Sequence, residues 1–233
     1  CNARLHDRGL RAEGNCRMIR LLRFPLLCVA LLFTGCYLPT DFDAQLQIDK
    51  RGNYIFRYDG KLTHLGLLRQ LARKEITQQE GLEKVAFIRR DLARDKAFGA
   101  GATIQKRVAN IKHLRDATFE VKYKRSSNIN QGRSYSFIRF NSRMLGISRV
   151  PNKGKGGEGF LVKVFGDKPN KELIETLEKA NLMANGRLRI QTDARVLRHN
   201  ADKQYSSGGL RVYVWNIKSL KKASPHLSFT LQQ

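Results

Sequence analysis

The sequence predicts an α+β fold, mainly an antiparallel sheet with about three helices, preceded by a signal segment that is not part of the fold. Apolar and polar residues alternate with a period of two in several windows, which is typical of half-buried strands. Apolar residues at helical spacing are confined to a few other windows. Because strands and helices do not alternate as regular βαβ units, a parallel sheet is not expected.

The amino-terminal segment has the pattern of a secretion signal. Residues 1–17 are polar and do not begin with Met, so we expect an upstream, non-native extension with translation starting at Met18. Two arginines then precede a short apolar run at 24–33, and small residues follow it. These are the parts of a signal peptide, which we expect over 18–35. The run is too short to cross about 30 Å of hydrocarbon as a helix.

The segment 32–36, LFTGC, resembles the lipobox of bacterial prolipoproteins, although Phe33 stands where that family usually has Leu. The resemblance implies cleavage between Gly35 and Cys36 and a diacylglycerol on the Cys36 thiol. It therefore implies a lipid-anchored protein of the bacterial cell envelope. Asp after the cysteine retains such proteins in the inner membrane, and Tyr37 implies the outer membrane, facing the periplasm. A buried strand or helix ending in cysteine is the alternative, but it does not explain the two arginines.

Residues 36–40 are expected to be a lipidated linker, and residues 41–233 a single exported domain. All four cysteines lie in the first 36 residues, so the domain has no disulfide. A domain of about 200 residues buries roughly 70% of its unfolded surface, and this is enough for a stabilising hydrophobic core.

The domain is predicted to begin with a hairpin and two helices. Alternation over 41–50 and 54–62 around a turn containing glycine indicates two antiparallel strands. Leucines at helical spacing predict a helix over 65–72. Thr77 and Glu80 form a capping box at the start of the next helix.

Strand patterns return in the second half of the domain. The predicted strands cover 118–124, 135–140, 144–150, 160–165, 187–192, 210–217 and 227–231. The strands at 144–150 and 160–165 flank a glycine-rich stretch and are expected to form a hairpin. One more helix follows Pro169, and Asn185-Gly186 is expected to close it.

The last fifth of the chain resembles the tails of several uncharacterised exported lipoprotein domains. The segments LRI at 188–190, VLRHN at 196–200 and VYVW at 212–215 contain the resemblance, with Pro225 after them. It implies no catalytic role. We expect Trp215 to anchor the core from a strand.

The domain has no motif that predicts catalysis, a metal or a cofactor. Glycines at 154, 156 and 159 match the letters of a dinucleotide fingerprint, but a strand pattern follows where a helix is required. Asp41 and Asp43 share a strand face and are either paired carboxylates or part of a solvated face. None of the four histidines of the domain has a second His, Cys or carboxylate at the spacing of a metal site: His64, His113, His199 and His226. We therefore expect a non-enzymatic protein without metal or cofactor.

Charge is the most distinctive property of the chain, which has 44 Lys and Arg against 20 Asp and Glu, a formal net charge of +24. Residues 103–155 are rich in basic side chains and contain only two acidic ones. Aromatic residues alternate with these cations: Tyr123, Tyr135, Phe137 and Phe140. We expect a basic face that binds an anionic partner through Lys122, Lys124, Arg125 and Arg139. An ordinary solvated face is the alternative.

Three functions follow from these patterns. The favoured one is a lipid-anchored envelope protein with a binding or structural role, whose partner is an anionic lipid, lipopolysaccharide, an anionic wall polymer or an acidic protein. The second is a protein that binds single-stranded nucleic acid, since basic residues with interspersed aromatics fit that class. It is less favoured because a lipidated Cys36 places the domain outside the cytoplasm. An envelope hydrolase is the third.

Overall fold

A computed structural model describes residues 37–138, 144–152, 159–167 and 169–232, which belong to one compact unit. Several features expected from the sequence lie outside the described residues: the signal peptide at 18–35, the cleavage site at Gly35, the lipidation site at Cys36, Arg139 and Phe140, and most of the glycine-rich stretch. The described fold is α+β with mostly antiparallel strands, as predicted.

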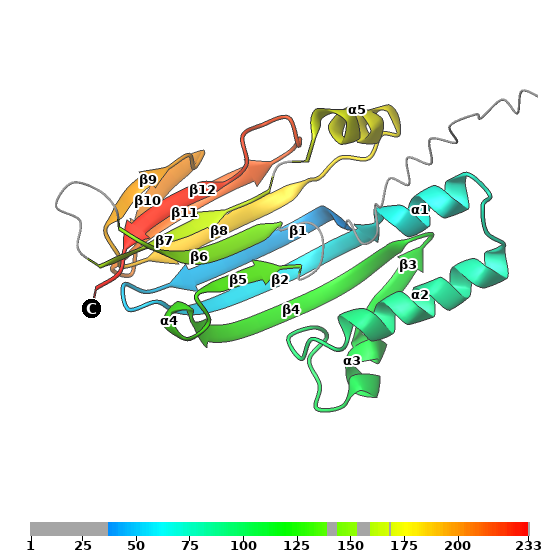
Figure 1. The fold of residues 1–233 in the computed structure, drawn as a ribbon, viewed down its shortest axis with the longest axis horizontal. Coiled ribbons are helices and arrows are strands. Elements are labelled where there is room, and N and C mark those ends of the chain that lie inside the picture. Colours follow the sequence, from blue (N-terminus) through cyan, green and yellow to red (C-terminus); the bar gives the residue numbers. More distant parts are fainter. Residues whose placement is uncertain (1–36, 139–143, 153–158, 168, 233) are drawn as a thin grey trace, which may run out of the picture. The chain divides into compact units, whose positions relative to one another are not determined.

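Seven strands form the larger sheet: β1 (Tyr37–Ile48), β2 (Asn53–His64), β3 (Lys112–Arg115), β4 (Thr118–Asn128), β8 (Gly186–Thr192), β10 (Lys203–Ser207) and β11 (Leu210–Ile217). Their order is β10-β11-β8-β1-β2-β4-β3 (Figure 1). The expected hairpin of β1 and β2 lies at the centre of this sheet. β8 pairs with β1 in parallel, so the carboxyl-terminal half of the chain extends the sheet on the β1 side.

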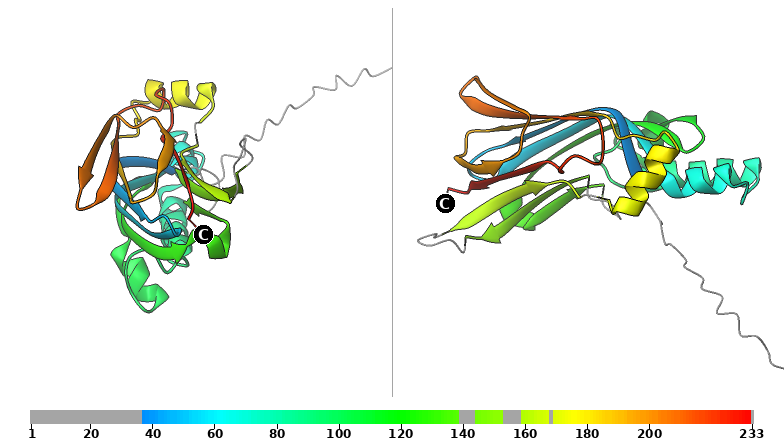
Figure 2. Two further views of the ribbon diagram at one scale, coloured as in Figure 1. Left: turned by 90° about the vertical axis from the view of Figure 1, so that its left-hand side faces the viewer. Right: turned by 90° about the horizontal axis from the view of Figure 1, so that it is seen from above.

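Five strands form the smaller sheet: β5 (Ser134–Phe137), β6 (Leu145–Pro151), β7 (Phe160–Phe165), β9 (Val196–His199) and β12 (His226–Thr230). Their order is β5-β6-β7-β12-β9, and the expected β6–β7 hairpin is confirmed. The two sheets form two layers (Figure 2). Phe137 of β5 packs between them, with its ring centroid 5.1 Å from that of Phe56 and 4.8 Å from that of Tyr58. These rings define the inner face of each sheet.

Helices lie at the ends and edges of the sheets: α1 (Leu65–Ala72), α2 (Gln78–Leu92), α3 (Ile104–Asn110), α4 (Ile129–Gly132) and α5 (Lys171–Lys179). The capping box at α2 is confirmed, since the Thr77 N–H donates to Glu80 Oε2 at 2.7 Å and the Glu80 N–H donates to Thr77 Oγ1 at 3.2 Å. Arg89 of α2 donates to the carbonyls of Ile111 and Val108, both at 2.8 Å. These bonds fix α2 to the end of α3.

The predicted end of the helix after Pro169, which is α5, is wrong. α5 ends at Lys179, and Asn181 follows in a left-handed conformation with φ 54°. Asn185 instead hydrogen-bonds the side chain of Asp41, and Gly186 begins β8. A Cβ at Gly186 would lie 2.4 Å from the Phe42 ring. The Asn-Gly pair therefore allows β8 to approach β1 and does not cap the helix.

The expected linker over residues 36–40 is also wrong for residues 37–40. β1 begins at Tyr37, and Pro39 and Thr40 already pair with β2. Leu38 is only 3% exposed. Its burial explains why this segment is part of the folded unit and not a spacer.

Candidate functional site

Two of the three basic residues predicted on β4, Lys122 and Lys124, lie on the face of the larger sheet that points away from the core, here called the outer face. Val121 and Tyr123 are buried on the inner face, whereas Lys122 and Lys124 are exposed. Since successive side chains of a strand point to opposite faces, both lysines belong to the outer face, as the alternation predicted. Antiparallel pairing places them directly beside residues of β2.

Lys124 lies directly opposite Arg57 of β2, and both side chains are exposed. Neither side chain forms an ion pair with any of the described residues. Like charges at directly opposite positions destabilise a sheet. The register is nevertheless fixed, because a shift by one residue would expose the apolar inner face. The fold thus holds two uncompensated cations side by side.

The same row of the outer face continues across β1 to β8. Gln45 lies opposite Arg57 on one side and beside Arg189 on the other. Arg189 contacts Asp43 at 2.9 Å, but its Nε is a buried donor without a hydrogen-bond partner among the described residues. The row therefore presents cations from three strands with Gln45 between them.

The adjacent row is partly neutralised. Lys122 Nζ lies 3.6 Å from Asp59, and Arg187 lies 3.0 Å from Asp43. Exposed pairs of this kind contribute only about 0–1 kcal/mol, so their cations remain available to another anion. We call the five cations of the two rows the basic cluster: Arg57, Lys122, Lys124, Arg187 and Arg189.

Arg125 does not join the basic cluster. It lies opposite the buried Phe56, which places it at the inner face. Its guanidinium carbon is 5.5 Å from the centroid of the Tyr135 ring, and its Nη1 is 3.8 Å from Asp95. These contacts tie β4 to the segments beside it. Arg125 thus has a packing environment of its own, on the other side of the sheet from Lys122 and Lys124.

The aromatic residues between 103 and 155 that were expected beside the cations and that the structure describes, Tyr123, Tyr135 and Phe137, pack in the core. Tyr123 and Phe137 are buried, and the Tyr135 hydroxyl donates to the Tyr123 hydroxyl at 3.0 Å. Burial is the main reason why the pKa of Tyr123 rises to about 12. These rings pack against each other and are not available to stack on nucleic-acid bases.

Sequence reasoning missed Arg57, Arg187 and Arg189 as members of the basic cluster. All three occupy polar positions in predicted strands, and that alternation was the available signal. Their proximity to Lys124 depends on the β2–β4 register and on the parallel β1–β8 pair. Neither relationship follows from local pattern.

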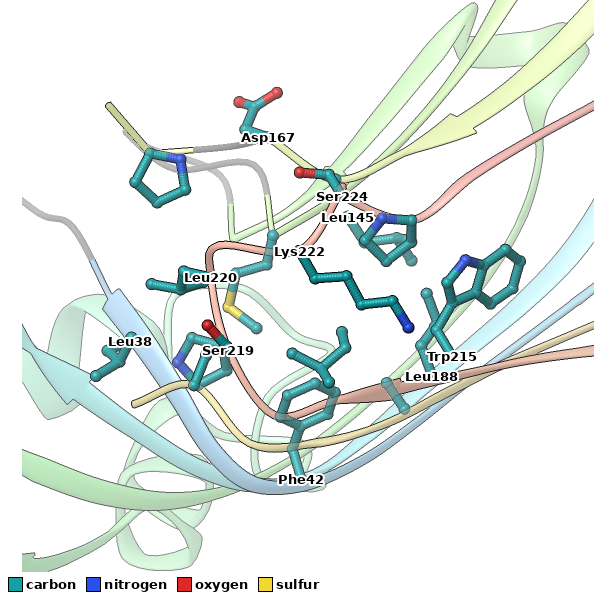
Figure 3. Close-up of a pocket in the computed structure, with 18 of the residues that line it drawn as sticks. Leu38, Phe42, Leu145, Asp167, Leu188, Trp215, Ser219, Leu220, Lys222 and Ser224 are labelled. Atoms are coloured by element: carbon teal, nitrogen blue, oxygen red, sulfur yellow. The ribbon is translucent and has the colours of Figure 1, made fainter. Parts of the chain in front are cut away.

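A second feature is a pocket of about 130 Å³ lined mostly by apolar side chains, here called the apolar pocket (Figure 3). Its walls come from both sheets, from α5 and from the loop at 219–225. Residues that line it include Leu38, Phe42, Leu145, Leu173, Leu188 and Trp215.

The apolar pocket lies at the boundary between two hydrophobic clusters. The main core contains Phe42, Leu188 and Trp215, whereas Leu38 and Leu177 belong to a smaller cluster beside α5. Apolar side chains of the two clusters therefore face a common space.

The polar groups around the apolar pocket are paired with one another. Asn200 Oδ1 accepts hydrogen bonds at 2.8 Å from Trp215 Nε1 and from the His226 N–H. Lys222 forms an ion pair with Asp202. This hydrogen bond, followed by one from the Asn216 N–H, lowers the pKa of Asp202 below its ordinary range. The pocket thus has little uncompensated charge at its rim.

The two aspartates and three of the four candidate histidines have structural partners. Asp41 pairs with Lys61 at 2.7 Å, while Asp43 pairs with the arginines of β8, so the two carboxylates bind different cations. His64 Nδ1 accepts the Leu67 N–H at 3.0 Å and caps α1. Burial lowers the pKa of His64. Two other histidines bond nearby backbone atoms, His113 at 2.9 Å and His199 at 3.2 Å.

The described ranges contain neither a metal-binding cluster nor a helix suited to span a membrane. There is no group of three or more His, Cys, Asp or Glu side chains that could hold a metal ion in this part of the chain. Of the helices that the structure describes, none is both long and apolar enough to cross a bilayer. The chain also matches no protein-family model and no curated protein.

Proposed function

We propose that the protein is a lipid-anchored, non-enzymatic component of the bacterial cell envelope that binds a phosphate-bearing lipid surface through its basic cluster. The observation that supports this most is that Arg57 and Lys124 lie directly opposite each other on neighbouring strands and that neither forms an ion pair with a described residue. Phospholipid and lipopolysaccharide phosphates are the favoured partners. Anionic wall polymers and acidic proteins remain alternatives of the same charge.

The arrangement of the basic cluster fits a surface rather than a single small anion. Its cations are spread over β2, β4 and β8, on one face of a twisted sheet. Each Lys or Arg near an anionic leaflet contributes about 1 kcal/mol, and this attraction falls off within a Debye length. Several cations on one face therefore favour an extended array of phosphates.

The expected anchor and the basic cluster would act on the same surface. β1 begins at Tyr37, the residue after Cys36, and contains Gln45, which lies between Arg57 and Arg189 on the outer face. Gln45 lies eight positions along β1 from Tyr37, about 26 Å at the usual rise of about 3.3 Å per residue. Two acyl chains already anchor stably, whereas one gives only reversible binding. Charge attraction would orient the domain so that the outer face lies against the leaflet.

The structure supports binding of single-stranded nucleic acid less well than the amino-acid composition did. That alternative relied on aromatic rings beside the cations, and Tyr123 and Phe137 are core residues. The envelope hydrolase has no additional support, since Asp41 and Asp43 and three of the histidines, His64, His113 and His199, have separate structural partners.

The proposal is tested by sedimentation with vesicles, using the protein from Tyr37 onward so that no lipid contributes. It should bind anionic vesicles better than neutral ones, and binding should weaken strongly from about 0.05 to 0.2 M salt. Arg57→Gln with Lys124→Gln should weaken binding by roughly thirtyfold, corresponding to about 2 kcal/mol.

The matched control is Lys163→Gln with Arg198→Gln. These residues are also one Lys and one Arg, both exposed, and they lie opposite Ser228 from either side in the smaller sheet. The control changes the net charge equally but leaves the basic cluster intact. An equal loss of binding in both double variants would contradict a specific face and indicate an effect of net charge alone.

A further inference from the structure

We propose that the apolar pocket binds the end of one acyl chain of a membrane lipid. The site lies between the sheets and α5, and it is separate from the basic cluster on the outer face. That the ligand comes from a membrane rests on the proposed attachment to the envelope. That the pocket binds hydrocarbon rests only on its own lining.

The lining selects for hydrocarbon. Figure 3 shows Phe42, Leu188 and Trp215 on one side of the pocket and Leu220 of the 219–225 loop on the other. Leu173 and Leu177 of α5 also line it. The indole N–H is already bonded to Asn200, so it offers no donor to a polar ligand. Ligand pockets of this type use apolar walls for affinity and a few polar groups for orientation.

The size of the apolar pocket limits what part of a lipid enters. Its volume of about 130 Å³ is close to that of apolar cavities of about 150 Å³ that stay dry and bind benzene. A run of about six carbons fits such a volume. The rest of the chain and the headgroup would remain outside.

The Lys222–Asp202 pair marks the polar rim of the site. Figure 3 shows the Lys222 side chain extending across the pocket toward Trp215. Because Lys222 is neutralised by Asp202, the rim attracts no anion strongly. The ligand is therefore recognised by its chain and not by its charge.

The position of the apolar pocket supplies the argument for a membrane lipid. Tyr37, Leu38 and Pro39 all line it. They are the three residues that follow Cys36, the expected point of lipid attachment. If the chain is anchored there, the pocket wall begins at the membrane surface, where acyl chains are the abundant apolar groups.

The chain provides its own reporter, because Trp215 is the only tryptophan and lines the apolar pocket. A bromine atom quenches indole fluorescence on contact. The probe is a long-chain alcohol brominated at its terminal carbon, which has no charge for the basic cluster to attract. It should quench Trp215 saturably in the protein from Tyr37 onward, and the affinity should not change between about 0.05 and 0.2 M salt.

Two variants test the pocket by different means. Leu173→Gln puts an amide into the lining of the pocket. It should weaken binding of the alcohol by about tenfold or more, equivalent to about 1.4 kcal/mol. Ala184→Leu adds bulk at a buried lining position and should also reduce quenching. The control is Leu114→Gln, since Leu114 is exposed on β3 and does not line the pocket. Circular dichroism verifies that each variant is folded.

A second arm tests the membrane source with neutral vesicles whose phospholipid chains are brominated. Quenching of Trp215 that Leu173→Gln reduces supports uptake of a membrane acyl chain. Quenching by the alcohol but not by these vesicles overturns that source. Absence of saturable quenching, or equal quenching in all three variants, overturns the site itself. Neither result depends on anionic lipid, so failure here is distinct from failure of the basic cluster.

Discussion

Asn200 joins Trp215 to the strand that follows the 219–225 loop: its side-chain oxygen accepts hydrogen bonds from the Trp215 indole and from the backbone of His226. Its Nδ2 also donates to the Ser224 carbonyl at 2.8 Å. The exposed amide of Asn200 thus fixes two parts of the apolar pocket. One is the Trp215 side chain, which is only 3% exposed, and the other is the 219–225 loop.

Asn200→Ala should lower the free energy of unfolding by about 1–2 kcal/mol, because it removes the acceptor for a buried indole N–H. This loss lies at the lower end of the range of about 1–3 kcal/mol for an unsatisfied buried group, because Asn200 is exposed to solvent. Urea unfolding followed by Trp215 fluorescence measures it. Asn216→Ala is the control, since Asn216 is exposed and its side chain forms no hydrogen bond with a described residue, and it should stay within about 0.5 kcal/mol of wild type. Equal effects would contradict a specific role for Asn200.

Because the pKa of Asp202 is lowered, we expect the free energy of unfolding to decrease at low pH. The hydrogen bond from Lys222 is the first cause and the Asn216 N–H the second, and both favour the carboxylate. Because the pKa is lower in the folded state, the stabilisation is complete above the unfolded value of about 4 and is lost as pH falls through the folded value. Wild type should therefore exceed Asp202→Asn in unfolding free energy near neutral pH, and the difference should shrink below about pH 4. A difference that stays constant down to about pH 2 would rule out this linkage.

Local sequence patterns were sufficient for the elements that depend on neighbouring residues. The β1–β2 hairpin, the capping box at Thr77 and the β6–β7 hairpin were predicted in this way. The strands that were missed, β3, β9 and β10, have four or five residues each. Every side chain of β10 is exposed, so the strand lacks the alternation that identifies a half-buried element.

The candidate sites were predictable only in part for a similar reason. The alternation around Lys122 and Lys124 placed both on a polar strand face, and the structure agrees. Arg125, expected on the same basic face, lies one position further along and therefore at the inner face. The approach of Arg57 to Lys124 depends on pairing across 67 positions of the chain. The apolar pocket brings β1 together with α5 and the 219–225 loop, and no local pattern signals such a meeting.

Cys36→Ala should release the protein from the membrane fraction or leave it as an unprocessed precursor. The expectation rests on the lipobox-like LFTGC segment, and it is sharpened by the start of β1 at Tyr37, which leaves no spacer between a lipid and the fold. Fractionation and mass analysis of the mature amino terminus measure the outcome. Recovery of the variant as a normally cleaved, membrane-bound protein would contradict attachment through this cysteine. Cys28→Ala, within the apolar run, is the control and should leave attachment unchanged.

Lys124→Glu should make the protein more stable but weaken its binding to anionic vesicles. The substitution places a carboxylate opposite Arg57, so repulsion between two cations becomes attraction worth about 0.2–1 kcal/mol. Lys122→Glu is the matched variant on the same strand. It breaks the pair with Asp59 and places two carboxylates opposite each other, and it should destabilise the sheet by a similar amount.

Both substitutions change the net charge equally and lie in the basic cluster, so both should weaken vesicle binding. Their effects on stability should have opposite signs, because Arg57 and Asp59 are their respective neighbours. Urea unfolding and vesicle sedimentation of the two variants measure these quantities separately. If Lys124→Glu destabilised the fold as much as Lys122→Glu, the Arg57–Lys124 pair would not be a site of uncompensated repulsion. The main observation behind the proposed function would then be lost.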